Sequence, residues 1–385
     1  MNDPFDLPPD VLRRIPLFAE LAKVLSWSAG PVNWDLARQI AVSVAAGEDP
    51  QQQVDVSDAT AMSEHIKLAE MWLLEITGLP DPTTVRPIRA VTAVDWAESA
   101  TTTFAELIDP IALKASRALT EQLGEAGEGD PIQQALSQMG PMLMGIQAGG
   151  IVGQLAREVL GTHEVPFPID EPATLLIVPA IDRVAAEHAV DRRDVRQWVA
   201  LQAAARRLTL DGVSWIPTHF FALYHNFVAT LDLTIAEGLQ KLQQLDLSDP
   251  ARLQEALGEG SLFSSEASPQ TAEAAGRVDG FLAVIEAHGT VAVETAAARL
   301  GADAMRLAEV FARRDAGAGA GTGALMSFLG LEPETDRRRA LAFVRAILAH
   351  GDWALLHRVW EDAGSFPSEA ELTDPPRWIE RMEAA

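Results

Sequence analysis

Apolar residues recur at helical spacing along most of this chain, and many of these stretches open on residues that commonly begin helices. The clearest helix starts are Ser57-Asp58, Ser248-Asp249-Pro250, Ser268-Pro269, Thr335-Asp336 and Thr373-Asp374-Pro375. Strand signals are few. Residues 174–181, TLLIVPAI, form a short β-branched run bounded by prolines, which predicts an edge strand. The pattern therefore predicts a mainly α protein with a minor β element.

The most membrane-like stretch is MGPMLMGIQAGGIVGQLAREVLG, residues 139–161. Pro141, Gln147 and Gln154 interrupt it, and a spanning helix needs about 20 mostly apolar residues. We therefore expect a buried helix and no membrane insertion. Gly149 and Gly153 lie one turn apart, a spacing that lets a neighbouring helix approach closely.

The 385 residues, 48% of them hydrophobic, can build one large domain or two ordinary ones. We expect residues 1–30 to form an N-terminal extension packed on a single large domain over residues 31–385. A division of that domain into two lobes near residues 165–190 is the alternative. The glycine-rich stretch 315–324 lacks the Lys-Ser/Thr pair of a phosphate-binding loop and predicts a flexible connector.

The net charge and the absence of cysteine limit the classes of binding partner and the kinds of site chemistry that we expect. The formal net charge of −25 disfavours nucleic acid and anionic membrane surfaces, because both would repel the chain. With no cysteine there are no disulfides, thiolate ligands or thiol nucleophile. The N-terminus has no signal-peptide pattern, so we expect a cytoplasmic protein.

Residues 191–210, DRRDVRQWVALQAAARRLTL, predict a helix with two different stripes. Successive residues are about 100° apart around a helix, so Gln202 and Arg206 share a face with Val195 and Val199. Trp198 belongs to the adjacent apolar stripe. A polar pair at such a border is either a surface edge, with the arginine reaching for solvent, or a buried site with partners.

Longer stretches carry a family resemblance. They include LPPDVLRRIPLFAELAKVLSWSAGPVNWDLARQIA, GGIVGQLAREVLG, TLLIVPAIDRVAAEHAVDRRDVRQWVAL and LGLEPETDRRRALAFVRAILAHGDWALLHRVWEDAGSFPSEAELTDPPRWIERM. From about residue 5 to 382 the chain resembles a zincin-like bacterial family of hydrolases. These are commonly labelled zinc-dependent metalloproteases, some of them associated with deazaflavin coenzyme biosynthesis. The resemblance implies a zincin-like, mainly helical domain.

The resemblance also implies a His-Glu-x-x-His motif on the central helix, which this chain lacks. Two histidines one turn apart would bind zinc there, and the glutamate would act as general base. The matching positions hold Gln202, Ala203 and Arg206. Glu286, in VIEAHG, matches the family's third ligand, and His288 lies close by in sequence. The resemblance thus implies a lost zinc site, with neither metal nor cofactor.

A carboxylate left without its metal is expected to find another cation. We predict that Arg206 pairs with Glu286, in which case removal of one partner would cost about 3–5 kcal/mol. The alternative is a solvated Glu286 with Arg206 pointing elsewhere.

These residues predict a catalytically inactive zincin-like metallopeptidase homologue. It would bind an unknown protein or peptide partner in the former active-site cleft, or serve as a scaffold. The nearby cleft candidates are His288, His219 and Trp198. The alternatives are an active hydrolase with a relocated or metal-free site and a purely structural role. No G-x-S-x-G nucleophile motif occurs, and the oligomeric state is left open.

Overall fold

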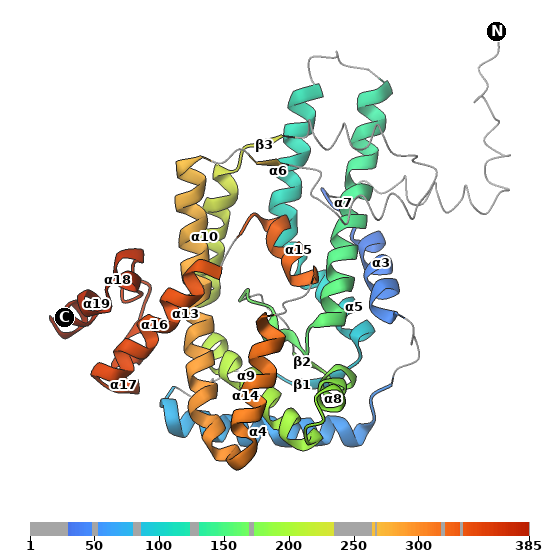
Figure 1. The fold of residues 1–385 in the computed structure, drawn as a ribbon. Helices are drawn as coiled ribbons and strands as arrows, with labels where there is room; N and C mark the ends of the chain where they lie inside the picture. The colour runs from blue at the N-terminus through green and yellow to red at the C-terminus, as the bar shows by residue number, and fades with distance from the viewer. Residues whose placement is uncertain are drawn as a thin grey trace, which may run out of the picture.

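The computed structural model describes residues 30–47, 53–79, 86–123, 131–168, 173–234, 264–265, 268–316, 320–331 and 334–384. Helices dominate it, as predicted (Figure 1). In the first half these are α3 (Trp34–Ala46), α4 (Val56–Thr77), α5 (Ala93–Thr103), α6 (Ala105–Leu123), α7 (Pro131–Glu158), α8 (Val178–Glu187), α9 (Arg192–Gly212) and α10 (Ile216–Thr230). In the second half they are α13 (Pro269–Ala297), α14 (Ala304–Ala316), α15 (Ala320–Leu329), α16 (Glu334–His350), α17 (Trp353–His357), α18 (Glu369–Thr373) and α19 (Pro375–Ala384). The short 3-10 segments are η2 (Thr162–Glu164), η3 (Ala298–Asp303) and η4 (Arg358–Trp360).

Four of the five predicted helix starts are confirmed. Helices α4, α13, α16 and α19 begin within two residues of the predicted positions. At α13 the Ser268 hydroxyl accepts from the Thr271 amide at 3.0 Å, which satisfies one of the donors that a helix start leaves open. The predicted start at residues 248–250 lies outside the described residues, as does the predicted N-terminal extension apart from residue 30.

The β structure is small. Strand β1 (Ile88–Val91) pairs in parallel with β2 (Thr174–Ile177), and β3 (Leu233–Thr234) pairs antiparallel with β4 (Ser264–Ser265). The predicted strand at 174–181 is correct for its first half only. Helix α8 starts at Val178, with Pro179 in its first turn, where proline is well tolerated.

The small-residue stripe of α7 lies against α3, as the glycine spacing predicts. A Cβ added at Gly149 would meet the Ala37 carbonyl, and one added at Gly153 would lie 2.6 Å from the Val44 Cβ. Side chains at these positions would force the two helices apart. The stretch at 139–161 is therefore an interior helix that depends on its glycines.

The described part of the glycine-rich stretch at 315–324 is helical, whereas the composition predicts a flexible connector. Helix α15 includes residues 320–324, and the Glu158 carboxylate accepts from the amides of Gly321, at 2.8 Å, and Thr322, at 3.3 Å. A carboxylate at a helix start satisfies open amides and favours the helix dipole. The capping residue comes from α7, far away in sequence, so local composition could not reveal it.

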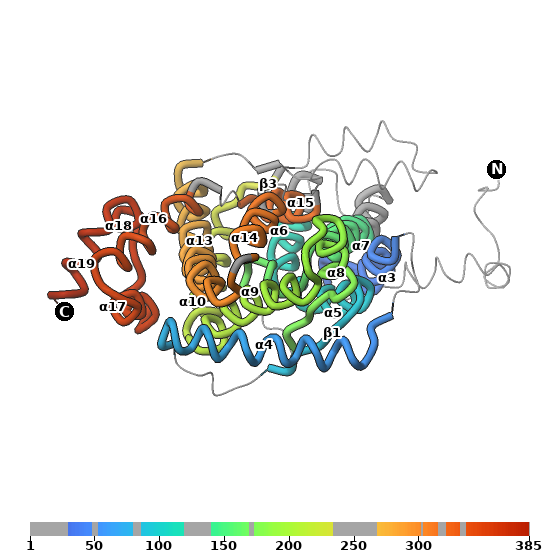
Figure 2. Tube along the Cα trace, turned by 60° about the horizontal axis from the view of Figure 1, so that its bottom comes forward, coloured from blue at the N-terminus to red at the C-terminus, as the bar shows by residue number. Residues whose placement is uncertain are grey.

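Helices α10 and α13 run side by side through the middle of the molecule, and α4 crosses beneath them (Figures 1 and 2). Residues 269–301 form one helical stretch that is long and apolar enough to cross a membrane. Its most apolar window is 67% buried inside the molecule, as in a core helix of a soluble protein. Buried residues from Val32 to Met382 form one hydrophobic cluster. The predicted division near residues 165–190 stays a prediction.

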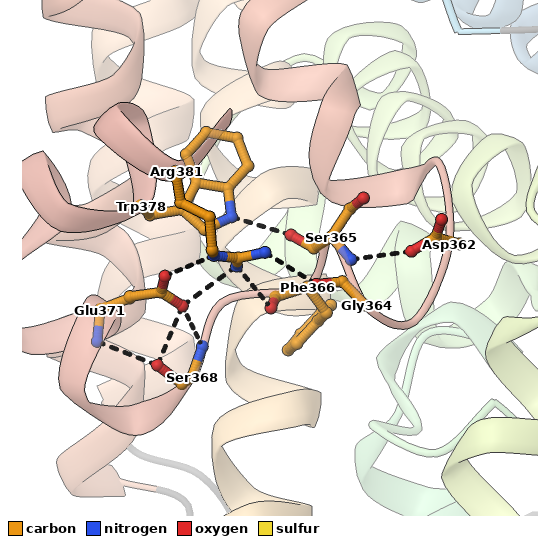
Figure 3. Close-up of polar contacts among 8 residues, drawn as sticks. All are labelled: Asp362, Gly364, Ser365, Phe366, Ser368, Glu371, Trp378 and Arg381. Carbon is orange, nitrogen blue, oxygen red and sulfur yellow. Dashed lines mark hydrogen bonds and ion pairs between the residues drawn. The ribbon is translucent and has the colours of Figure 1, made fainter. Parts of the chain in front are cut away.

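The C-terminal helices α16 to α19 cover the outer side of α13 (Figure 2). Arg381 of α19 holds the turn before α18. Its Nε donates to Glu371 at 2.6 Å, and its Nη1 donates to the Gly364 carbonyl at 2.8 Å (Figure 3). Trp378 donates to the Ser365 carbonyl at 2.8 Å. These contacts fix the turn whose Phe366 ring lies 4.9 Å from the ring of Phe281 on α13.

Candidate functional site

Helix α9 is a central element of the molecule, packed against α4, α8 and α13. The Asp191 side chain caps it by accepting from the Arg193 amide at 2.8 Å. Arg196 ties its first turns to the neighbouring helices through ion pairs with Asp58 of α4 and Asp182 of α8, both at 2.8 Å. A helix held this firmly presents its side chains from fixed positions.

Two positions of α9 stand out by their exposure. From Val195 to Thr209 every residue is buried except Gln202 and Arg206, which are partly accessible. Residues four apart project from the same face of a helix. The two positions that the resemblance matches to zinc-binding histidines therefore form a narrow accessible stripe on a helix segment that is otherwise buried.

Arg206 lies in this stripe as a cation with little local compensation. Its Nη2 donates to the Pro166 carbonyl, in the extended segment after η2. Burial lowers the pKa of Arg206 to about 10, and the attraction of Glu286 opposes that shift. The guanidinium is therefore still protonated at neutral pH and remains a permanent positive charge.

Glu286 lies on α13 and forms its ion pair with another arginine. Its Oε1 is 3.0 Å from the Nε of Arg337 on α16, and both side chains are about a third exposed. Glu286 also attracts Arg206 electrostatically, and the predicted pairing of these two residues stays a prediction. Arg337 opens a run of three arginines in the sequence, and no spacing in that run singles it out.

His163 is a site residue that sequence analysis missed. Both of its ring nitrogens are buried and have no hydrogen-bond partner among the described residues. Burial, followed by the charges of Arg314 and Arg206, lowers the pKa of His163 to about 3. The ring is therefore neutral at physiological pH, and the charge of Arg206 contributes to that shift. Its place in η2 depends on Gly161, where a Cβ would collide with the Leu175 carbonyl.

The resemblance matches Gln202 and Ala203 to the positions of the family's first ligand and general base. The Gln202 Oε1 is buried and has no hydrogen-bond partner in the part of the chain that the structure describes. Ala203 is 1% exposed and belongs to the core. Neither side chain can act as a general base.

His288 is a core residue of α13. Its Nδ1 lies 3.3 Å from the Thr209 hydroxyl of α9, and its ring meets the edges of Trp353 and Trp360 at centroid distances of 5.7 and 5.2 Å. Burial and the nearby His357 lower the pKa of His288 to about 3. These contacts give the side chain a packing role between α13 and the C-terminal helices.

The other two predicted site residues are also surrounded by aromatic rings. His219 lies 5.6 Å from the ring of Trp215 and 5.1 Å from that of Phe281. Trp198 stacks on Phe311 at 5.5 Å. Among the described residues, these ring contacts join His219 and Trp198 to aromatic side chains and not to Gln202 or Arg206.

Comparison with known proteins identifies the scaffold. The sequence model of the zincin-like metallopeptidase family matches residues 32–379. The chain belongs to this family. A crystal structure from Chloroflexus aurantiacus, described as a "putative hydrolase with a novel fold", has the same fold as this zincin-like protein. The TM-score is 0.66 and the identity 21%, over 92% of this chain and 99% of that one. No curated protein matches this chain.

The family name implies zinc, and the residues at the matching positions do not fit that ion. A hydrolytic zinc site uses three protein ligands, drawn from neutral imidazole, thiolate and carboxylate. Arg206 cannot deprotonate to bind a metal and would repel one. Glu286 already faces the guanidinium of Arg337. Over the described ranges, no group of three or more histidines or carboxylates is placed to hold a metal ion.

Proposed function

We propose that this zincin-like protein does not hydrolyse peptides and instead binds a protein or peptide partner. The binding surface would be the face of α9 that carries Gln202 and Arg206. One observation carries the proposal. A protonated guanidinium stands at a zinc-binding position, on one of the two accessible residues of a helix segment that is otherwise buried.

The charge of Arg206 supports loss of hydrolysis more strongly than a missing ligand would. A neutral substitution leaves a weakened site, whereas a fixed cation also raises the energy of any divalent ion placed beside it. The base position is filled by a core alanine. The residues of this face therefore support neither activation of water by a metal ion nor removal of a proton by a general base.

The acidic composition supports a cytoplasmic protein or peptide as the partner. A net charge of −25 opposes nucleic acid and anionic membranes. Arg206 on α9 gives such a partner a positively charged contact, although the molecule as a whole is negative.

A peptide-retention assay tests binding and catalysis together. Immobilised protein is incubated with a synthetic pool of random-sequence dodecapeptides, and mass spectrometry identifies the retained and released peptides. We expect a subset to be retained intact, because the face binds but has no catalytic apparatus. Arg206→Glu should abolish retention, because it reverses the charge at the proposed contact.

The matched control is Arg277→Glu, which changes an exposed arginine of α13 that pairs with Glu273. It should retain the same peptides as the wild type. Cleaved peptides in the wild-type sample would contradict the proposal and favour an active hydrolase with a relocated or metal-free site. Retention that survives Arg206→Glu would move the binding surface away from α9.

A further inference from the structure

A cavity of about 720 Å³ lies between α6, α10 and the start of β3 (Figure 1). Its volume falls within the range of about 300–1,000 Å³ that is usual for small-molecule sites. Among the described residues that line it, none belongs to α9. The cavity is therefore not part of the peptide-binding face proposed above.

Two helices present side chains of one face to this cavity. Leu113, Lys114 and Arg117 follow one another at helical spacing on α6, and His225 and Val228 do so on α10. Residues three and four apart lie on the same side of a helix. The basic side chains of α6 and the apolar ones of both helices therefore meet in one hollow.

Lys114 is held in a fixed position at the end of α10. Its Nζ donates to the carbonyls of Val228, at 2.9 Å, and Ala229, at 2.6 Å. These two bonds use two of the three N–H groups of an ammonium. Burial lowers the pKa of Lys114, and the attraction of Asp232 opposes that shift. An anion in the cavity would offset the cost of this burial and accept the third N–H.

The lining combines this charge with apolar surface. Val228 and Leu233 are buried, whereas Leu113 is 44% exposed and is one of the few large apolar side chains that the structure describes as exposed. An aliphatic group in the cavity would remove the Leu113 side chain from water, which is favourable. Such a mixture of apolar walls and a few polar groups is typical of small-molecule sites.

The charges of the lining favour an anion over a cation. Lys114 and Arg117 are basic, Asp232 is the acid among the described lining residues, and His225 adds a ring nitrogen that can donate a hydrogen bond. The chain as a whole carries a net charge of −25, so a cavity with two basic side chains differs in sign from the rest of the molecule. A local positive potential raises the concentration of small anions at the site.

We propose that this cavity binds a small amphiphilic anion, an aliphatic chain that ends in a carboxylate or a phosphate. The anionic group would bind Arg117 and the third N–H of Lys114, and the chain would lie against Leu113, Val228 and Leu233. The inference does not rest on the proposed function, because the two sites share no residue.

Calorimetric titration of the full chain with octanoate, octyl phosphate and octan-1-ol tests the site. We expect at least one of the two anions to bind about ten-fold more tightly than the alcohol, which has the same chain without the charge. The anion that binds more tightly tells a carboxylate site from a phosphate site. Arg117→Gln should weaken binding of that anion about five-fold and leave the alcohol unchanged. The control Arg313→Gln removes an exposed arginine of α14 that pairs with Glu309 and should change neither. Circular dichroism shows whether each variant is folded.

Introduced cysteines locate the bound anion, because the natural chain has no thiol. Ala229→Cys places a thiol in the lining, and Ala363→Cys places one in an exposed turn as control. The preferred anion, at ten times its dissociation constant, should slow the alkylation of Ala229→Cys by iodoacetamide about ten-fold. It should not slow the alkylation of Ala363→Cys.

Three results would overturn the inference. Binding of octan-1-ol as tight as that of both anions would refute anion recognition. No binding of either anion would refute the ligand site altogether. An anion preference that survives Arg117→Gln, or equal protection of both cysteines, would place the binding elsewhere on the molecule. The dodecapeptide assay decides the proposed function separately, because it uses a different face.

Discussion

At the scale of single residues, the sequence shows which residue types stand at the candidate site. It does not show which of these side chains pair with one another. The resemblance predicts that Gln202, Ala203 and Arg206 stand at the family's motif positions and Glu286 at its third ligand. The ion pair of Glu286 with Arg337 depends on how α16 lies against α13, and the position of His163 depends on the turn after Gly161. Such contacts join helices that are remote in the chain, so helical spacing carries no information about them.

The weak compensation of Arg206 has a consequence for stability. Arg206→Met keeps the length of the side chain, removes a poorly paired charge and gives up one hydrogen bond. We expect the free energy of unfolding to change by no more than about 1 kcal/mol. Urea denaturation followed by circular dichroism measures it.

Arg196→Met is the matched control on the same helix. Its guanidinium is 7% exposed and pairs with Asp58 and Asp182. Its removal should lower the free energy of unfolding by about 2–3 kcal/mol. The loss should not be larger, because Arg192 still pairs with the same two acids. An equal loss in the Arg206 variant would mean that Arg206 is as well paired as Arg196.

At the scale of elements, helical periodicity and start signals predicted the mainly α class and the positions of α4, α7, α9, α13, α16 and α19. They succeeded because capping and amphipathic spacing are local properties. They failed where a distant element decides the local structure. The strand at 174–181 ends early because α8 begins at Val178, and the glycine-rich stretch at 320–324 is helical because Glu158 caps it.

The contact between α3 and α7 offers the sharpest test of packing. In Gly149→Ala the new methyl group would meet the Ala37 carbonyl, so we expect a loss of about 2–3 kcal/mol of unfolding free energy. Gly150→Ala is the control, because nothing lies within 4 Å of its added Cβ. It should be stabilising by about 0.5–1 kcal/mol, since alanine favours a helix more than glycine does. Thermal denaturation of the two variants measures the difference, and equal effects would contradict the close packing.

At the scale of the whole molecule, two buried histidines make stability depend on pH. The pKa values of His163 and His288 are about 3 in the folded protein, against about 6.5 in an unfolded chain. As the pH falls below about 6.5, the unfolded state therefore binds more protons than the folded state does. The stability is complete above about pH 6.5 and declines from there toward pH 3.

Each of these histidines should lower the free energy of unfolding by roughly 2 kcal/mol at pH 5 relative to pH 7.5. His288→Phe places a non-titrating ring between Trp353 and Trp360. It should remove about half of the pH dependence that His163 and His288 produce together. Urea denaturation at the two pH values checks this. A variant whose pH dependence equals that of the wild type would show that His288 is accessible to protons in the folded state.

The central claim is that a cation has replaced the metal, and the metal content of the purified protein tests it most directly. Protein is expressed with added zinc, passed through gel filtration and analysed by plasma mass spectrometry. The double variant Gln202→His, Arg206→His serves as positive control. It supplies the two imidazoles that the resemblance implies at these positions and leaves the core residue Ala203 unchanged. We predict far less than one zinc ion per wild-type chain and a clear gain in the double variant. One tightly bound zinc ion per wild-type chain, lost when Glu286 is replaced by glutamine, would contradict the account.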